Sequence, residues 1–344
     1  MSLVFKKGFF MSNVFKPKVG RRTFLRAGAF ALASPAAIAL PAFAETAWPA
    51  RPIRIVVPYA AGQGADVLTR LLAQEMQKTL NQAFIIENHA GAGGNIGAAV
   101  AARATPDGYT FLLGTNATNA ANEFLFSNLG FSPEKDLEAV GMIGMLPMVF
   151  CSSAPDLQTN GIAELVAQAR LKPNTLNVGL PSTTAQVVFA QFVKDAQAPL
   201  FGVNYKSSGQ SMADVLGGQI PLVIDTVTAS RSYISSGKLR ALGITSPQAS
   251  EMLPGVKPVA EQGVAGFNVV AWDALFAPRA TPPEVVRKFS EHMQLAIRQP
   301  EMRRRMMDIG VEPRYMTPSE LSAFVKSERQ KWGDVIQAAG IRSE

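Results

Sequence analysis

The stretch IRIVVPYAAGQGADVLTRLLAQEMQKTL, residues 53–80, decides the fold of this chain. Its first five residues are apolar apart from Arg54, and Pro58 follows them, which predicts a buried strand over residues 53–57. The apolar residues beyond residue 64 recur at helical spacing: Leu68, Leu71, Leu72, Met76 and Leu80. A strand that leads through a glycine-containing loop into a helix is the first half of a βαβ unit.

The same alternation continues to both sides of Pro147. Before it we expect strands at 84–86 and 109–113, with a helix at 96–104 between them. After it we expect strands at 176–179, 202–205, 222–225 and 239–244, and helices at 162–171, 185–196, 212–216 and near residue 233.

The last hundred residues differ in composition. Residues 247–266 are rich in Pro and Gly and are interpreted as a connecting segment, and helices are expected at 283–298, 301–309 and 318–339. The whole order predicts an α/β protein of two lobes, each a mainly parallel sheet flanked by helices. We expect the chain to cross between the lobes near residues 145–148 and 266–272.

Charge is concentrated at the start of the chain. The 344 residues carry a formal net charge of +7. Residues 1–44 contain seven basic side chains and no acidic one, so residues 45–344 are formally neutral. The basic residues are Lys6, Lys7, Lys16, Lys18, Arg21, Arg22 and Arg26. A nucleic-acid-binding surface is therefore not expected, because the positive charge does not belong to the folded part.

Residues 1–44 have the order of an export signal. The stretch GRRTFLR at 20–26 precedes the mostly apolar residues 27–40, and Ala42-Phe43-Ala44 supplies small residues before Glu45. The arginine pair is typical of the twin-arginine type, with the general secretory route as the alternative. We expect cleavage after Ala44 and a periplasmic protein of a Gram-negative bacterium. A membrane anchor is the other interpretation, but the apolar run is short against the roughly 20 residues that span a bilayer.

Four loops at the predicted carboxyl ends of strands share a composition of small and hydroxyl-bearing residues. They lie at 59–66 and 114–119 in the first half, and at 179–184 and 205–209 in the second. Free amides at a helix N-terminus bind anions without an arginine, so two such ends facing each other suit a molecule with carboxylates. The alternative is that these are ordinary turn and cap residues. Asp225 likewise either orients an amine or hydroxyl of a ligand or caps the next turn.

Enzyme signatures are incomplete. The glycines at 91–93 and 62–64 lack the third glycine of a dinucleotide fingerprint, and no phosphate loop or nucleophile elbow is present in the sequence. His89 and His292, the two histidines, support neither a zinc site nor a general base. Cys151 has no partner for an intramolecular disulfide and is interpreted as a buried apolar residue. We therefore expect a binding protein without catalytic residues, metal or cofactor; an exported enzyme acting on carboxylic acids is the alternative.

Short motifs in a fixed order extend from Trp48 to about Ile341. They are WPARPIRIVVP (48–58), ENHAGAGGNIG (87–97), PDGYT (106–110), GT (114–115), LGGQ (216–219), SGKLRAL (236–242), PVAEQG (258–263) and APRATP (277–282). On these motifs the chain resembles the substrate-binding proteins of tripartite tricarboxylate transporters, often called Bug receptors.

This resemblance implies a type II-like periplasmic binding fold that closes over a small organic anion. The signal would occupy residues 1–44, the first lobe 45–146 with 267–344, and the second lobe 147–266. Carried over by position, the ligand-binding residues are Tyr59, Ala61, Gly62, Gln63, Gly64, Asp66, Thr115, Asn116, Ser182, Thr183, Thr184, Tyr205, Lys206 and Asp225. The implied partners are the membrane permease of a tripartite transporter or, alternatively, a sensor kinase.

The chain departs from the family pattern at three places that bear on the ligand. Gln63 stands where glycine is common, Gln186 replaces a frequent histidine, and SSGQ at 207–210 replaces a glycine-proline pattern. The expected ligand is therefore a dicarboxylate, a tricarboxylate or an aromatic carboxylate. For an aromatic acid, Tyr59, Tyr205 or Trp272 would supply a stacking face, or else these are core residues.

Overall fold

The computed structural model describes residues 48–153, 157 and 159–342. The predicted export signal, residues 1–44 with its cleavage site after Ala44, lies outside the described residues. Among the helices of the described part, none is long and apolar enough to cross a membrane. Residues 46–344 cluster as one compact unit, and this unit contains two sheets.

The first sheet has six strands in the order β11-β4-β10-β3-β1-β2. Their bounds are β1 Ile53–Val57, β2 Phe84–Asn88, β3 Thr110–Thr115, β4 Leu137–Leu146, β10 Ala271–Pro278 and β11 Glu312–Pro313. Strand β1 pairs in parallel with β2 and β3, whereas β10 runs antiparallel to β3 and β4. The short β11 adds antiparallel to β4.

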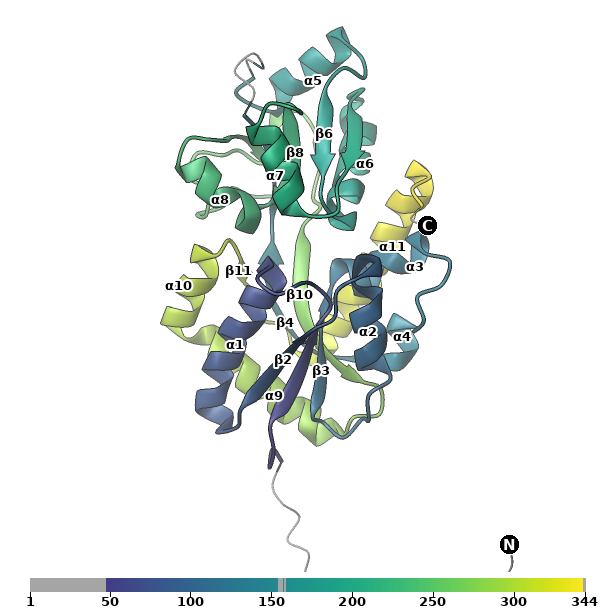
Figure 1. The fold of residues 1–344 in the computed structure, drawn as a ribbon, viewed down its shortest axis with the longest axis vertical. Helices are drawn as coiled ribbons and strands as arrows, with labels where there is room; N and C mark the ends of the chain where they lie inside the picture. Colours follow the sequence, from purple (N-terminus) through teal and green to yellow (C-terminus); the bar gives the residue numbers. More distant parts are fainter. Residues whose placement is uncertain (1–47, 154–156, 158, 343–344) are drawn as a thin grey trace, which may run out of the picture. The chain divides into compact units, whose positions relative to one another are not determined.

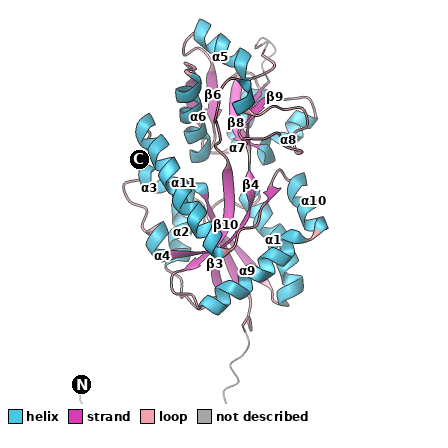
Figure 2. Ribbon diagram, turned by 180° about the vertical axis from the view of Figure 1, so that it is seen from behind, coloured by secondary structure: helices cyan, strands magenta, loops and turns pink. Residues whose placement is uncertain are grey.

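Helices cover both faces of this sheet (Figures 1 and 2). One face carries α1 (Gly64–Leu80), α9 (Pro283–Arg298) and α10 (Pro300–Asp308), and the other carries α2 (Asn95–Ala102) and α11 (Pro318–Ala339). The alternation of β1 explains this division: Ile53, Ile55 and Val57 pack in the core that includes α1 and α9, while Val56 packs in the core that includes α2 and α11. The short segments η1 (Ala92–Gly94), η2 (Ala117–Ala121), α3 (Asn122–Leu125) and α4 (Pro133–Asp136) complete this part.

The second sheet has five strands in the order β7-β6-β8-β5-β9. Their bounds are β5 Met148–Ser152, β6 Asn177–Leu180, β7 Phe201–Asn204, β8 Leu222–Thr226 and β9 Arg240–Ile244. Strand β6 is parallel to β7 and β8, and β5 is antiparallel to β8 and β9. The helical segments are α5 (Ile162–Leu171), α6 (Thr183–Ala196), α7 (Ser208–Leu216), α8 (Val227–Ser235) and η3 (Val259–Gln262).

The predicted two-lobed α/β class is confirmed, with one correction to the sheets. Both sheets are mixed rather than mainly parallel, because β4, β5 and β10 are antiparallel strands that the sequence did not predict. Residues 137–146, 148–152 and 271–278 are nearly continuous apolar runs, and none of them forms an edge strand of its sheet. Such runs lack the alternation that marks a strand with one exposed face. The chain passes from β4 into β5 through Pro147 alone.

One hydrophobic core is shared by the two sheets. It includes Phe150 and Phe192 with the second sheet and Trp272 and Trp332 with the first, and α11 packs against α6. Trp272 is fully buried, lies 5.7 Å from the ring of Phe324, and its indole N–H donates to Glu328. Trp272 is therefore a core residue and not a stacking face for a ligand.

Candidate functional site

The loop between β1 and α1 is held in shape by Asp66. This carboxylate accepts the amide N–H of Gly62 at 2.8 Å, the Nε–H of Arg70 at 3.0 Å and the side-chain amide of Asn88 at 3.0 Å. Burial alone would raise the pKa of Asp66, but the hydrogen bonds from Arg70, Gly62 and Asn88 outweigh it and hold that pKa below its usual value. Both carboxylate oxygens are thus engaged by groups of the loop, of α1 and of the end of β2. The geometry makes Asp66 a support for this loop.

Helix α1 begins without a side-chain cap. Gln63 occupies its N-cap position and makes no capping hydrogen bond. The first amides of a helix have no partner inside it, so they are available to an outside acceptor such as a carboxylate. Gly62 has φ +82°, and a Cβ there would meet nothing within 4 Å, so the backbone of this loop is approachable.

The helices that follow the parallel strands of the second sheet differ from α1. Ser182 accepts the amide of Ala185 at the start of α6, Ser207 accepts that of Gln210 at the start of α7, and Thr226 accepts that of Ala229 at the start of α8. Ser182 and Ser207 are therefore cap residues, as one interpretation of their loops predicted, and Thr226 is a cap that the sequence did not predict. Each cap satisfies one amide and leaves others at the same helix end.

The loop after β3 contains a network of short polar side chains. The hydroxyls of Tyr59 and Thr115 lie 2.9 Å apart, and the amide of Thr115 donates to the hydroxyl of Thr118. The loop continues as the π-helical turn η2, a geometry that recurs at functional sites. Burial raises the pKa of Tyr59 to about 12, so its hydroxyl stays neutral and can donate.

Two of the contacts between the parts that carry the two sheets involve predicted site residues. The side-chain amide of Asn116 donates to the hydroxyl of Thr184 at 2.8 Å, and both residues are buried. Gly64 lies against α8, since a Cβ at this position would be 3.2 Å from Cγ2 of Thr228. The uncapped end of α1 thus lies where residues of the two sheets meet.

The other predicted site residues are hydrogen-bonded within their own part of the structure or are exposed. The hydroxyl of Tyr205 donates to Asp214 on α7 at 2.7 Å, and Lys206 is exposed. Ala61, Gln63 and Ser182 are exposed, and Thr183 is half-buried. Within the described part of the chain, no hydrogen bond joins Tyr205 or Lys206 to the loops of the first sheet. The structure therefore joins Tyr59 to Thr115 and Asn116 to Thr184 by hydrogen bonds, and gives no such link from the first-sheet loops to Tyr205 or Lys206 among the described residues.

Asp225 is the residue before the last of β8 and is 3% exposed. Its Oδ1 accepts the amide of Thr226 at 2.7 Å, and its Oδ2 has no hydrogen-bond partner among the described groups. Burial raises the pKa of Asp225 to about 6, although the Thr226 amide and the hydroxyls of Ser208 and Thr226 oppose this shift. Thr226, not Asp225, provides the side-chain cap of α8.

The sequence did not point to Asp273, which lies in β10 directly opposite Thr115 of β3. It is 4% exposed, and its Oδ2 has no partner in the described structure. Burial raises the pKa of Asp273 to about 7. The available signal was an acidic residue inside the apolar run AWDALFAP, but the start of this run was interpreted as a crossover rather than a strand.

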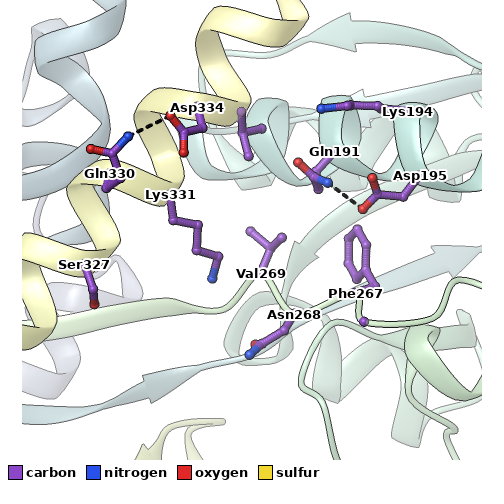
Figure 3. Close-up of a pocket in the computed structure, with 12 residues that line it drawn as sticks. Gln191, Lys194, Asp195, Phe267, Asn268, Val269, Ser327, Gln330, Lys331 and Asp334 are labelled. Atoms are coloured by element: carbon purple, nitrogen blue, oxygen red, sulfur yellow. Dashed lines mark hydrogen bonds between the residues drawn. The ribbon is translucent and has the colours of Figure 1, made fainter.

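A separate groove of about 460 Å³ lies between α6, residues 266–269 and α11 (Figure 3). It contains none of the predicted site residues, and its acidic side chains Asp195 and Asp334 accept hydrogen bonds from Gln191 and Gln330. The mixed charge of its lining gives no preference for a carboxylate. Among the described residues, no group of three or more His, Cys, Asp or Glu side chains is placed to hold a metal ion.

Comparisons with known sequences agree on one family. Residues 68–341 match the family described as tripartite tricarboxylate transporter family receptor. The chain is 36% identical to a UPF0065 protein of the TAR-I ttuE-ttuC' intergenic region of Agrobacterium vitis, over 86% of this chain and 87% of that protein. It is 33% identical to BugT of Bordetella pertussis, over 89% of this chain and 94% of that protein.

Solved structures give the same result. Rpa4515 of R. palustris with adipate superposes with a TM-score of 0.80 at 30% identity, covering 86% of this chain and 99% of that one. MatC of Rhodopseudomonas palustris with bound malate has a TM-score of 0.74 at 30% identity, covering 84% and 100%. The chain belongs to the tripartite tricarboxylate transporter receptor family, which includes the Bug proteins.

Proposed function

We propose that this protein captures a small organic carboxylate between its two lobes in the bacterial periplasm and presents it to a membrane permease of the tripartite type. The observation that carries this proposal is the uncapped N-terminus of α1, which meets α8 at Gly64. A helix start of this kind binds a carboxylate through its free amides and its dipole. The similar solved structures with adipate and with bound malate support a dicarboxylate as the ligand class.

The proposed contacts come from the loops that follow parallel strands. The first lobe would supply Tyr59, Thr115, Asn116 and the backbone of residues 61–64, with Asp66 holding that backbone in place. The second lobe would supply residues 182–184, Tyr205, Lys206 and Asp225. The hydrogen bond between Asn116 and Thr184 supports a site shared by both sets of loops.

Capture would depend on closure of the lobes and would involve no catalysis. We assign residues 45–146 and 267–344 to one lobe and 147–266 to the other, so that closure changes the angle between β4 and β5 near Pro147. A ligand that contacts both lobes shifts the equilibrium toward the closed form. The closed form would then be the one recognised by the permease; a sensor kinase is the alternative partner, and pull-down from membranes distinguishes the two.

The test begins with thermal-shift measurements on residues 45–344 against a panel of organic acids, because a ligand that binds only the folded state raises the melting temperature. Calorimetry on the positive acids should then show saturable binding, and the acid should be recovered intact after incubation. Turnover of the acid would instead favour an exported enzyme. The absence of binding by every di-, tri- and aromatic carboxylate would contradict the proposal.

A further inference from the structure

Asp273 is a buried carboxyl group at the centre of the first sheet. Strand β10 places it between Thr115 of β3 and Gly144 of β4, with 4% of the residue exposed. Its neighbours two positions away on the same strand, Ala271 and Leu275, pack in the core that carries α1 and α9. Asp273 therefore interrupts an otherwise apolar row on that face of the sheet.

No group in the described protein pairs with the Oδ2 of this side chain. Glu328, a buried carboxylate on α11, shows the usual arrangement: it accepts the indole N–H groups of Trp272 and Trp332 and lies 3.3 Å from the Nζ of Lys331. A buried carboxyl oxygen without a donor is costly, so such a group calls for an explanation. The position of Asp273 allows one such explanation: a bound ligand supplies the hydrogen-bond donor.

That position is next to the proposed carboxylate site. Thr115 lies opposite Asp273 in the ladder, and its hydroxyl is hydrogen-bonded to that of Tyr59. Tyr59 lies at the start of the loop that leads into α1. The charge of Asp273 is close enough to Tyr59 to raise the pKa of its hydroxyl. Asn116, which directly follows β3, donates the hydrogen bond to Thr184.

We propose that Asp273 is a specificity-determining residue that selects organic acids bearing a hydrogen-bond donor, a hydroxyl or an ammonium group, on the carbon next to a carboxylate. This inference rests on the proposed function of the same site. The helix start would hold the carboxylate, and the unpaired oxygen of Asp273 would accept the donor. An acid without the donor would bury that oxygen unpaired, and sites built for a donor discriminate strongly against such analogues.

Calorimetry on residues 45–344 with matched acids tests this inference. The probes are succinate, malate and aspartate, which share a four-carbon backbone and differ in carrying no donor, a hydroxyl or an ammonium group. Glutarate, 2-hydroxyglutarate and glutamate form a second series one carbon longer. In at least one series we expect a donor-bearing acid to bind about 10- to 100-fold more tightly than the acid without a donor.

Asp273→Ala should bring the donor-bearing and donor-free acids of that series within about threefold of each other. Asp107→Asn is the matched control, because it removes one negative charge from the turn at the opposite end of β3 and should preserve the wild-type ratio. Thermal melting of each variant separates a loss of binding from a loss of folding.

Two further results would each have a distinct meaning. If succinate and glutarate both bind as tightly as their donor-bearing partners, or if Asp273→Ala weakens all acids of the discriminating series equally, the inference is overturned while the proposed function stands. If none of the acids in a wider panel binds the wild-type protein, the proposed function fails and this inference fails with it.

Discussion

Asp66 and Asp273 are both almost completely buried, yet their surroundings move their pKa values in opposite directions. Burial raises the pKa of both, but three donors surround Asp66 and bring its pKa below the usual value, whereas burial alone acts on Asp273 and raises its pKa to about 7. The hydrogen bonds to Asp66 therefore stabilise the folded protein fully above the unfolded-state pKa of about 4. This stabilisation is lost as the pH falls through the lower folded-state pKa of Asp66. For Asp273 the effect of pH on stability is reversed, because its raised folded pKa makes the ionised carboxylate a cost that grows as the pH rises.

We predict that Asp273→Asn stabilises the ligand-free protein in a pH-dependent way. Because the folded pKa of Asp273 is raised, its cost to stability is absent below the unfolded pKa of about 4, grows as the pH rises, and is complete above about 7. The full cost is at most about 4 kcal/mol. The melting temperature of the variant should therefore exceed that of the wild type more at pH 8 than at pH 4.5, and a difference that does not grow with pH would contradict the assignment.

At the scale of elements, the long helices were predictable, and three buried antiparallel strands were not. The helices at 162–171, 283–298 and 318–339 have the observed bounds because their apolar residues recur with a helical period. Strands β4, β5 and β10 run antiparallel through the middle of their sheets and are buried on both faces, so their sequences show no alternation.

The same difference decides how much of the candidate site could be predicted. Tyr59, Thr115 and Thr184 were identified because the sequence places them in loops between a predicted strand and a predicted helix, where ligand contacts are common. In the structure Thr115 ends β3 and Thr184 lies in the first turn of α6. Asp273 lies inside a strand that was not predicted, and its relation to Thr115 is a matter of register between strands about 160 residues apart in sequence. Nothing local to residues 271–278 reveals that pairing.

The start of α1 gives a prediction with a closely matched control. Gly62 and Gly255 have φ of +82° and +84°, and a Cβ at either position would meet nothing within 4 Å. Valine should therefore cost a similar amount of stability at both, roughly 1–2 kcal/mol, through backbone strain. Only Gly62→Val changes the loop that exposes the amides of α1, so calorimetry with a bound acid should show at least about a tenfold loss for Gly62→Val and native affinity for Gly255→Val. Equal affinities of the two variants for the acid would show that this loop is not part of the binding site.

For the molecule as a whole, the core shared by the two sheets makes α11 a structural link between them. We predict that Glu328→Ala lowers the free energy of unfolding by roughly 2–4 kcal/mol, because it leaves the indole N–H groups of Trp272 and Trp332 buried without an acceptor. Urea unfolding followed by tryptophan fluorescence measures this change. Glu301→Ala, which breaks an exposed pair with Arg304, should change stability by less than about 1 kcal/mol. A loss at Glu328 no larger than that at Glu301 would show that the buried carboxylate is not needed by the shared core.

The approach of Gly64 to Thr228 gives a direct test of closure. A side chain at residue 64 begins 3.2 Å from Cγ2 of Thr228, so Gly64→Val should oppose the contact between α1 and α8 while α1 itself tolerates the substitution. In small-angle scattering, the wild type should contract when a binding acid is added, and Gly64→Val should contract less and bind the acid more weakly. Adding Thr228→Ala removes the opposing methyl group and should restore part of both effects, which a non-specific loss of stability would not do. Full contraction and native affinity in Gly64→Val would show that ligand capture does not require this approach of the two lobes.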